Sequence, residues 1–108
     1  MAKQLFMVLS EAAEGKEDEF NDWYEHTHLD EVIHTSAVVS AQRYKLAGQR
    51  GAEAPNRYLA IYEVDVDDPS EVFPSIDAKG AERNDSDAID RSTRGAWVWT
   101  PIGEKHGE

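Results

Sequence analysis

The chain has 108 residues, and its 22 Asp and Glu residues against 11 Lys and Arg residues give a formal net charge of -11 at pH 7. This length fits a single domain, taken as residues 1–108. Phosphate backbones and anionic membrane surfaces are bound through basic patches, so neither nucleic acid nor a membrane is an expected partner. The chain contains no cysteine, which excludes disulfides, thiolate metal sites and cysteine nucleophiles.

The first half of the chain predicts a strand, a long helix and a second strand. The apolar run 4–9 predicts the first strand and is too short for a signal-peptide core or a membrane span, so we expect a cytoplasmic protein. Carboxylates at 17–19 favour the start of a helix running from about residue 16 to 33. Residues 37–46 predict the second strand, and 47–56, with its glycines and proline, predict a loop.

The second half predicts a strand at 57–66, a second helix, and a last strand at 95–100. Asp68 is the expected N-cap of that helix, with Pro69 at its first position and Glu71 completing a capping box. The polar stretch 79–95 predicts a loop or a frayed helix extension. The resulting order, β-α-β-β-α-β, predicts an α+β, ferredoxin-like fold: a four-stranded antiparallel sheet with both helices on one face.

Three of the predicted strands are apolar on both sides, namely the runs 5–9, 58–62 and 96–99. A sheet with one wet face should instead alternate apolar and polar residues. Two helices cover only one side, so large aromatic side chains on the other side would be exposed to water. We therefore predict an isologous homodimer packed sheet to sheet. The alternative is a monomer, in which the polar residues of the second strand keep that face wet.

The most informative motif lies in the predicted first helix, at residues 19–31. At helical spacing, Phe20, Trp23, Tyr24 and Thr27 share one face, and His28 follows Tyr24 at i+4. Trp, Tyr and His join apolar bodies to polar tips, which favours a pocket wall over a face that only covers a core. A purely structural helix, in which His28 bonds a carbonyl or a nearby carboxylate, is the alternative.

Two spacings in the same helix also occur in metal sites. His26 and His28 form His-x-His, and Glu25 with His28 forms Glu-x-x-His. On a regular helix, however, residues i and i+2 point about 200° apart, so one ion would not meet both imidazoles. We expect no metal site. No nucleotide fingerprint, phosphate loop or Gly-x-Ser-x-Gly elbow is present in the sequence.

The order of elements, the run Glu-Phe-x-x-Trp-Tyr-x-x-x-His at 19–28 and the Gln-Arg-Tyr at 42–44 resemble the dimeric α/β-barrel superfamily, and in particular its EthD-like branch. The resemblance covers residues 5–102. It implies that a His late in the first helix, here His28, faces a pocket and transfers protons, and that Trp23 and Tyr24 match the aromatic pair before it. Where relatives often carry Pro-Gly, this chain has Thr-Ser-Ala-Val at 35–38, so the pocket rim is expected to differ.

With this resemblance, we expect a small enzyme without a cofactor, acting as an isomerase, cyclase or lyase/dehydratase on an aromatic, enolic or lactone-like metabolite. His28 would be the general acid or base, and Tyr24 would stabilise an oxyanion. Two alternatives stay open: a non-catalytic ligand-binding or accessory protein of a degradation or biosynthetic pathway, and a small monooxygenase. The expected substrate-binding residues are Trp23, His26, Arg43, Tyr62, Trp97 and Trp99.

Overall fold

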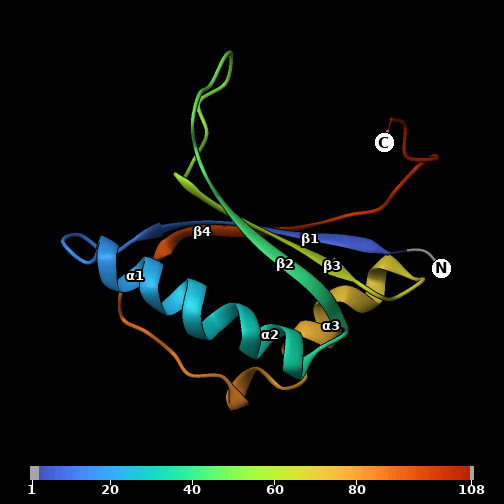
Figure 1. The fold of residues 1–108 in the computed structure, drawn as a ribbon, viewed down its shortest axis with the longest axis horizontal. Coiled ribbons are helices and arrows are strands. Elements are labelled where there is room, and N and C mark those ends of the chain that lie inside the picture. The colour runs from blue at the N-terminus through green and yellow to red at the C-terminus, as the bar shows by residue number, and fades with distance from the viewer. Residues whose placement is uncertain (1–2, 108) are drawn as a thin grey trace.

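A computed structural model describes residues 3–107. Its strands form one antiparallel sheet in the order β2-β3-β1-β4, and its helices lie on one side of that sheet (Figure 1). The predicted α+β, ferredoxin-like arrangement is therefore confirmed. The elements are β1 (Gln4–Ala12), α1 (Glu17–Trp23), a π-helical turn (Tyr24–His28), α2 (Leu29–Thr35), β2 (Val38–Lys45), β3 (Tyr58–Val64), α3 (Val72–Asp77) and β4 (Ile89–Trp99), with 3-10 turns at Pro69–Glu71 and Gly80–Glu82.

The strand boundaries differ most from prediction at one end of the sheet, where β1 pairs with β4. β4 begins at Ile89 instead of residue 95, and β1 continues to Ala12 instead of ending at residue 9. The two extensions pair with each other, Ala12 opposite Ile89, beyond an irregularity where β4 has more residues than β1 between the pairs Leu9–Gly95 and Glu11–Asp90. Ile89 is buried, so it anchors an otherwise polar and exposed stretch of strand that hydropathy alone does not reveal.

The start of the second helix follows the predicted cap. The Asp68 carboxylate accepts a hydrogen bond from the backbone N–H of Ser70 at 2.9 Å. Pro69 opens a 3-10 turn, and α3 begins only at Val72. Within residues 3–107 the Glu71 side chain makes no hydrogen bond, so the predicted capping box is not completed.

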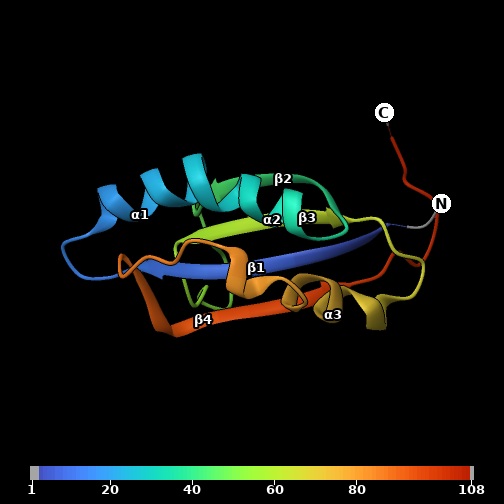
Figure 2. The same cartoon turned by 90° about the horizontal axis from the view of Figure 1, so that it is seen from below.

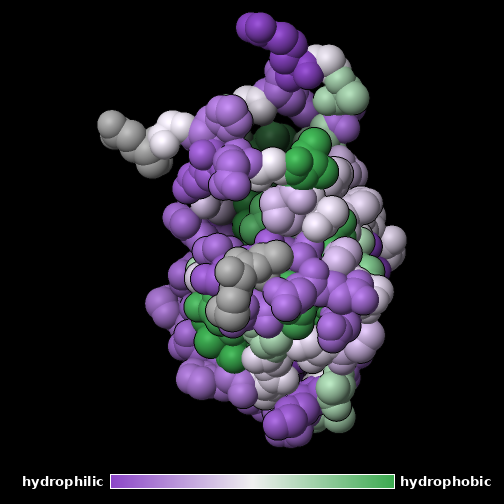
Figure 3. Space-filling view, turned by 90° about the vertical axis from the view of Figure 1, so that its right-hand side faces the viewer, coloured by the Kyte–Doolittle hydropathy of each residue, from purple (hydrophilic) through white to green (hydrophobic). Residues whose placement is uncertain are grey.

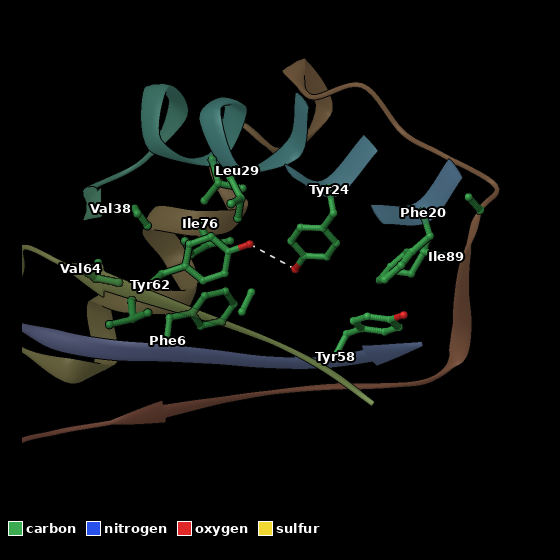
Figure 4. Close-up of a cluster of buried hydrophobic side chains, with 14 residues drawn as sticks. Phe6, Phe20, Tyr24, Leu29, Val38, Tyr58, Tyr62, Val64, Ile76 and Ile89 are labelled. Atoms are coloured by element: carbon green, nitrogen blue, oxygen red, sulfur yellow. Dashed lines mark hydrogen bonds between the residues drawn. The ribbon is translucent and has the colours of Figure 1, made fainter. Parts of the chain in front are cut away.

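The helices bury alternate residues of the inner strands. On β1 and β3, Gln4 lies opposite Val64 and Phe6 opposite Tyr62, and all four are buried on the helix side. The side chains of Phe6, Tyr62 and Val64 meet those of α3 and of the long helix, which is formed by α1, the π-helical turn and α2, in a single core (Figure 4). The core thus fills the space between one face of the sheet and the helices, and the cavity described below lies in that same layer.

The other face of the sheet carries no helix (Figures 1 and 2). The register places Leu5 beside Trp99 and Met7 beside Trp97 on this face, with Ile61 on the far side of Met7. Trp99 is 52% exposed and Trp97 is 41% exposed. The expectation that the sheet is apolar on both sides is confirmed. We define the open sheet face by its apolar side chains, Leu5, Met7, Leu9, Tyr44, Leu59, Ile61, Trp97 and Trp99.

A glycine lets one of these tryptophans lie along the sheet. A Cβ atom added at Gly95 would lie 2.6 Å from Cη2 of Trp97, which is closer than real side chains approach. The indole of Trp97 therefore lies over the Gly95 backbone, across the surface of the open sheet face. This position makes the face flatter than an upright indole would allow.

The connection between β2 and β3, residues 46–57, projects as an arm on the side of the sheet away from the helices (Figure 1). At its base, the Glu11 carboxylate accepts hydrogen bonds from the backbone N–H of Arg57 at 3.0 Å and from its Nε at 2.6 Å. A backbone bond of 2.7 Å from Leu46 N–H to the Arg57 carbonyl closes the two strands of the arm. The arm is thus tied firmly to the sheet where it leaves it.

Hydrophilic side chains cover most of the molecular end at which the N-terminal residues lie, and hydrophobic ones show only in patches between them (Figure 3). This surface fits the acidic composition of the chain. No helix within residues 3–107 combines the length and the apolar character needed to cross a membrane.

Candidate functional site

A cavity of about 360 Å³ lies between the helix-covered face of the sheet and the helices. Its sheet side is formed by residues of β1, β3 and β4, and its helix side by the π-helical turn, α2 and α3. This volume is at the small end of the range for ligand pockets, so it suits a small metabolite. The polar and aromatic side chains that line it are Phe6, Trp23, Tyr24, His28, Tyr62, Phe73, Asp77, Arg83 and Arg94.

The helix that carries the site is not regular, contrary to the prediction of one α-helix over 16–33. At Tyr24–His28 the chain forms a π-helical turn, and the Leu29 N–H bonds the carbonyl of Tyr24, five residues back. On a regular α-helix, residues five apart point about 140° from each other. The wider turn brings Trp23 and His28 together, and their rings stack with centroids 4.6 Å apart. Such turns inside α-helices occur frequently at functional sites.

His28 lies on the cavity wall as a largely buried, neutral imidazole. Its Nδ1 is buried without a hydrogen-bond partner among the described residues, while Nε2 is not buried. Burial, followed by the positive charge of Arg83, lowers the pKa of His28 from 6.5 to about 4, although Glu31 acts in the opposite direction. His28 is therefore uncharged at pH 7 and is able to accept a proton there. The purely structural alternative required His28 to bond a carbonyl or Glu31. In the described chain His28 makes neither bond.

A pair of tyrosine hydroxyls faces the same cavity. The Oη atoms of Tyr24 and Tyr62 lie 3.2 Å apart and share one hydrogen bond, shown dashed in Figure 4. Burial raises the pKa of both phenols, so both remain protonated at neutral pH. The shared bond uses only one of the two hydroxyl hydrogens. The other is available to donate to a ligand oxygen.

The segment that follows α3 is tied to the long helix beside the cavity. Trp23 Nε1 donates to the Asn84 carbonyl at 3.3 Å, and the Glu31 carboxylate accepts from Asn84 N–H at 3.0 Å and Nδ2 at 2.8 Å. Next to Asn84, Arg83 donates from Nε to Thr35 Oγ1 at 2.8 Å and from Nη2 to a carbonyl of α3 at 2.7 Å. These bonds hold the Arg83 guanidinium in the cavity lining.

Sequence reasoning brought together four residues that do meet here: Trp23, Tyr24, His28 and Tyr62 all line the cavity. It missed Arg83 and Arg94, because both fall in the polar stretch 79–95 that reads as a loop. The π-helical turn, by contrast, left a signal in the sequence. The buried positions of the helix fall at 20, 24, 29 and 32, and the step of five interrupts the usual spacing of three or four.

The other four expected binding residues lie outside this cavity. His26 is exposed on the helix surface. Trp97 and Trp99 are on the open sheet face, because successive strand residues point to opposite faces and their neighbour Val98 faces the helices with Phe6. Arg43 faces the helices but lies under α1, with its guanidinium 4.8 Å from the Tyr24 ring centroid and 2.7 Å from Asn21 Oδ1. The structure therefore does not place these four side chains in the cavity beside His28, and their role in ligand binding stays a prediction.

His26 and His28 also point to different surroundings, one exposed and one in the cavity wall. Among residues 3–107, no group of three or more His, Asp or Glu side chains is arranged to hold a metal ion.

Comparisons of the chain with protein-family models, with curated proteins and with solved structures found no match. The EthD-like resemblance of the helix motif therefore stays a prediction.

We expect the two cavity tyrosines to behave as a coupled pair in stability measurements. Tyr24→Phe or Tyr62→Phe alone leaves a buried hydroxyl without its partner, which costs about 1–3 kcal/mol of unfolding free energy. The double variant removes both hydroxyls and should cost clearly less than the sum of the single variants. Urea denaturation of the four proteins gives the coupling. Strict additivity would contradict the hydrogen bond between them.

We also expect His28 to make the protein less stable in mild acid. Its folded pKa of about 4 lies below the unfolded value of 6.5, so as the pH falls through this window the unfolded state binds the proton first. The imidazole's contribution to unfolding free energy should therefore drop by about 3 kcal/mol between pH 6.5 and pH 4. Comparing the denaturation of wild type with that of His28→Gln across this pH range isolates the contribution of His28, because the carboxylates titrate in both proteins.

The matched control is His26→Gln, since His26 is exposed on the same helix. It should keep the pH dependence of the wild type. If His28→Gln also kept that dependence, the imidazole would not be held neutral by its surroundings.

Proposed function

We propose that this protein is an enzyme without a cofactor that uses His28 to transfer a proton on a small aromatic, enolic or lactone-like metabolite. One observation carries the proposal: a neutral imidazole with an accessible Nε2 lies in a small, largely apolar cavity beside a pair of protonated hydroxyls. A base and a hydrogen-bond donor on one cavity are what removal of a proton next to a carbonyl requires.

The roles follow from the state of each group. His28 accepts the proton, because it is uncharged at pH 7. The free hydrogen of the Tyr24–Tyr62 pair stabilises the enolate oxygen that forms, and the buried position of the pair strengthens that interaction. Trp23 stacks on His28 and shapes the wall. If the enolate is protonated at another carbon, the enzyme is an isomerase. If the enolate attacks an internal carbonyl, it is a cyclase. If the enolate expels a neighbouring group, it is a lyase or dehydratase.

A ligand-binding or accessory protein is the second candidate, and the low pKa of His28 favours it. An imidazole with a pKa of about 4 is a weak base, and general bases work best with a pKa near the operating pH. This candidate predicts binding in the same cavity without turnover.

We further propose that two copies of the chain pair through the open sheet face. Its aromatic and aliphatic side chains form one patch across β1, β3 and β4, and exposed patches of this kind usually mark an interface. A second copy fits because an isologous pair covers the same patch on both subunits. The arm at 46–57 projects on this side of the sheet, where it would reach the partner (Figure 1).

The EthD-like resemblance stated above supports both parts of this proposal, because it implies a proton-transferring His in the first helix and a paired sheet. The cavity itself lies on the helix side and is lined by one chain. The second copy would therefore cover the open sheet face without enclosing the cavity.

The function is tested with a thermal-shift screen of aromatic, enolic and lactone metabolites, followed by exchange of the best ligand's acidic C–H in D2O, measured by NMR. We expect wild type to catalyse exchange and His28→Gln to lose about 100-fold or more of the rate while still binding. The exposed His34→Gln is the control and should keep the wild-type rate. Binding without exchange would favour the second candidate, and a co-crystal with the ligand remote from His28 would overturn the site.

Pairing is tested by light scattering at micromolar concentration. We expect wild type to have the mass of a dimer and Trp99→Glu to have that of a monomer, because a charge would then be buried within the interface. Ile102→Glu, which changes a fully exposed apolar residue outside the sheet, should remain a dimer. A monomer mass for the wild type would end this part of the proposal.

A further inference from the structure

The charge of the cavity is opposite to the charge of the chain. Acidic residues outnumber basic ones by 22 to 11 overall. The cavity is nevertheless lined by two arginines, the half-buried Arg83 and the exposed Arg94, against a single carboxylate, the exposed Asp77. Beyond a distance of about 8 Å the other surface charges are largely screened at physiological ionic strength, so the cavity presents a positive site to a ligand inside it.

The two cavity arginines also lack the partners that other arginines of the chain have. Arg43 pairs with Glu25, Arg57 with Glu11 and Arg91 with Asp85. Within the described part of the chain, Arg83 and Arg94 form no ion pair, and neither does Arg50 in the arm. In a chain with so many carboxylates, two uncompensated guanidiniums on one cavity point to a negative charge supplied from outside.

Arg83 is held in position by neutral groups only. Its Nε and Nη2 donate to the Thr35 hydroxyl and to the Ile76 carbonyl, which fix the guanidinium without neutralising it. The remaining N–H groups stay available for a ligand, and the planar guanidinium matches the geometry of a carboxylate. Arg94 comes to the same cavity from β4 and makes no hydrogen bond within residues 3–107, so its guanidinium is free to move onto a ligand.

Both arginines act on the reactive groups of the cavity. The positive charges of Arg83 and Arg94 each lower the pKa of His28. Burial raises the pKa of Tyr24 and of Tyr62. The charge of Arg94 opposes that rise for Tyr24, and the charge of Arg83 opposes it for Tyr62. Their guanidiniums therefore lie within electrostatic range of both the imidazole and the hydroxyl pair.

We propose that the substrate of this cavity carries a carboxylate, which Arg83 and Arg94 bind so that the reacting carbon faces His28. This inference rests on the proposed function, since it takes the cavity to be the substrate site. The inference narrows the substrate class from aromatic, enolic or lactone-like metabolites in general to those that carry a carboxylic acid. The carboxylate provides an orientation that apolar walls alone do not provide, because a charge-assisted pair fixes one end of the molecule.

The test compares two probes of the same shape, 4-hydroxybenzoate and 4-hydroxybenzamide, by isothermal titration at low and high salt. We expect wild type to prefer the carboxylate by about tenfold or more, and the preference to shrink at high salt. Arg94→Gln should remove most of that preference and leave amide affinity unchanged. Arg91→Gln, on the same strand but paired with Asp85, is the control and should behave as wild type.

Arg83→Gln should act in the same direction, but it also removes the bonds to Thr35 and Ile76, so Arg94→Gln is the decisive variant. Equal binding of the two probes by wild type, binding of neither at millimolar concentration, or a carboxylate preference that survives Arg94→Gln would each overturn the inference. A carboxylate preference combined with no His28-dependent exchange on any bound acid would instead overturn the proposed function, and of this inference it would leave standing the binding of a carboxylate by Arg83 and Arg94.

Discussion

The stacking of His28 on Trp23 is the interaction on which the candidate site depends, and it exists only because the helix widens between Tyr24 and His28. The extra residue in that turn moves His28 to the side of Trp23 and keeps Leu29 and Val32 directed into the core. In a regular α-helix through the same sequence, either the stacking of His28 on Trp23 or the burial of Leu29 and Val32 would be lost. The turn therefore satisfies the core and the cavity together.

The burial that makes His28 a cavity residue also makes it a weak base. Its surroundings supply two positive charges and one opposing carboxylate, Glu31, which is already engaged by Asn84. A ligand anion between Arg83 and Arg94 would offset those positive charges and so raise the pKa of His28. By linkage, a protonated His28 would in turn bind that anion more tightly. Basicity would then appear when the substrate is bound, so the weak base of the empty cavity and a catalytic role are compatible.

The order of elements and the paired apolar faces are visible in the sequence because each rests on local patterns that dominate their segments. Trp23, Tyr24 and His28 are recognisable for the same reason. The placement of Trp97 and Trp99 is not, because a strand that is apolar on both sides gives no parity by which to assign a face. β4 starts early through one buried residue, Ile89, within a polar stretch, and that stretch also hides Arg94. These placements depend on tertiary pairing that hydropathy does not encode.

The sheet separates the two surfaces to which we assign roles. Along β1, Phe6 and Val8 line the cavity, whereas Leu5 and Met7 alternate with them on the open sheet face. A partner seated on that face would contact the backs of the residues that form the cavity but would add no side chain to it. Its influence on a ligand would be indirect, through the rigidity of a strand that is packed on both sides. The proposed pairing and the proposed chemistry would thus use opposite faces of the same strands, through distinct side chains.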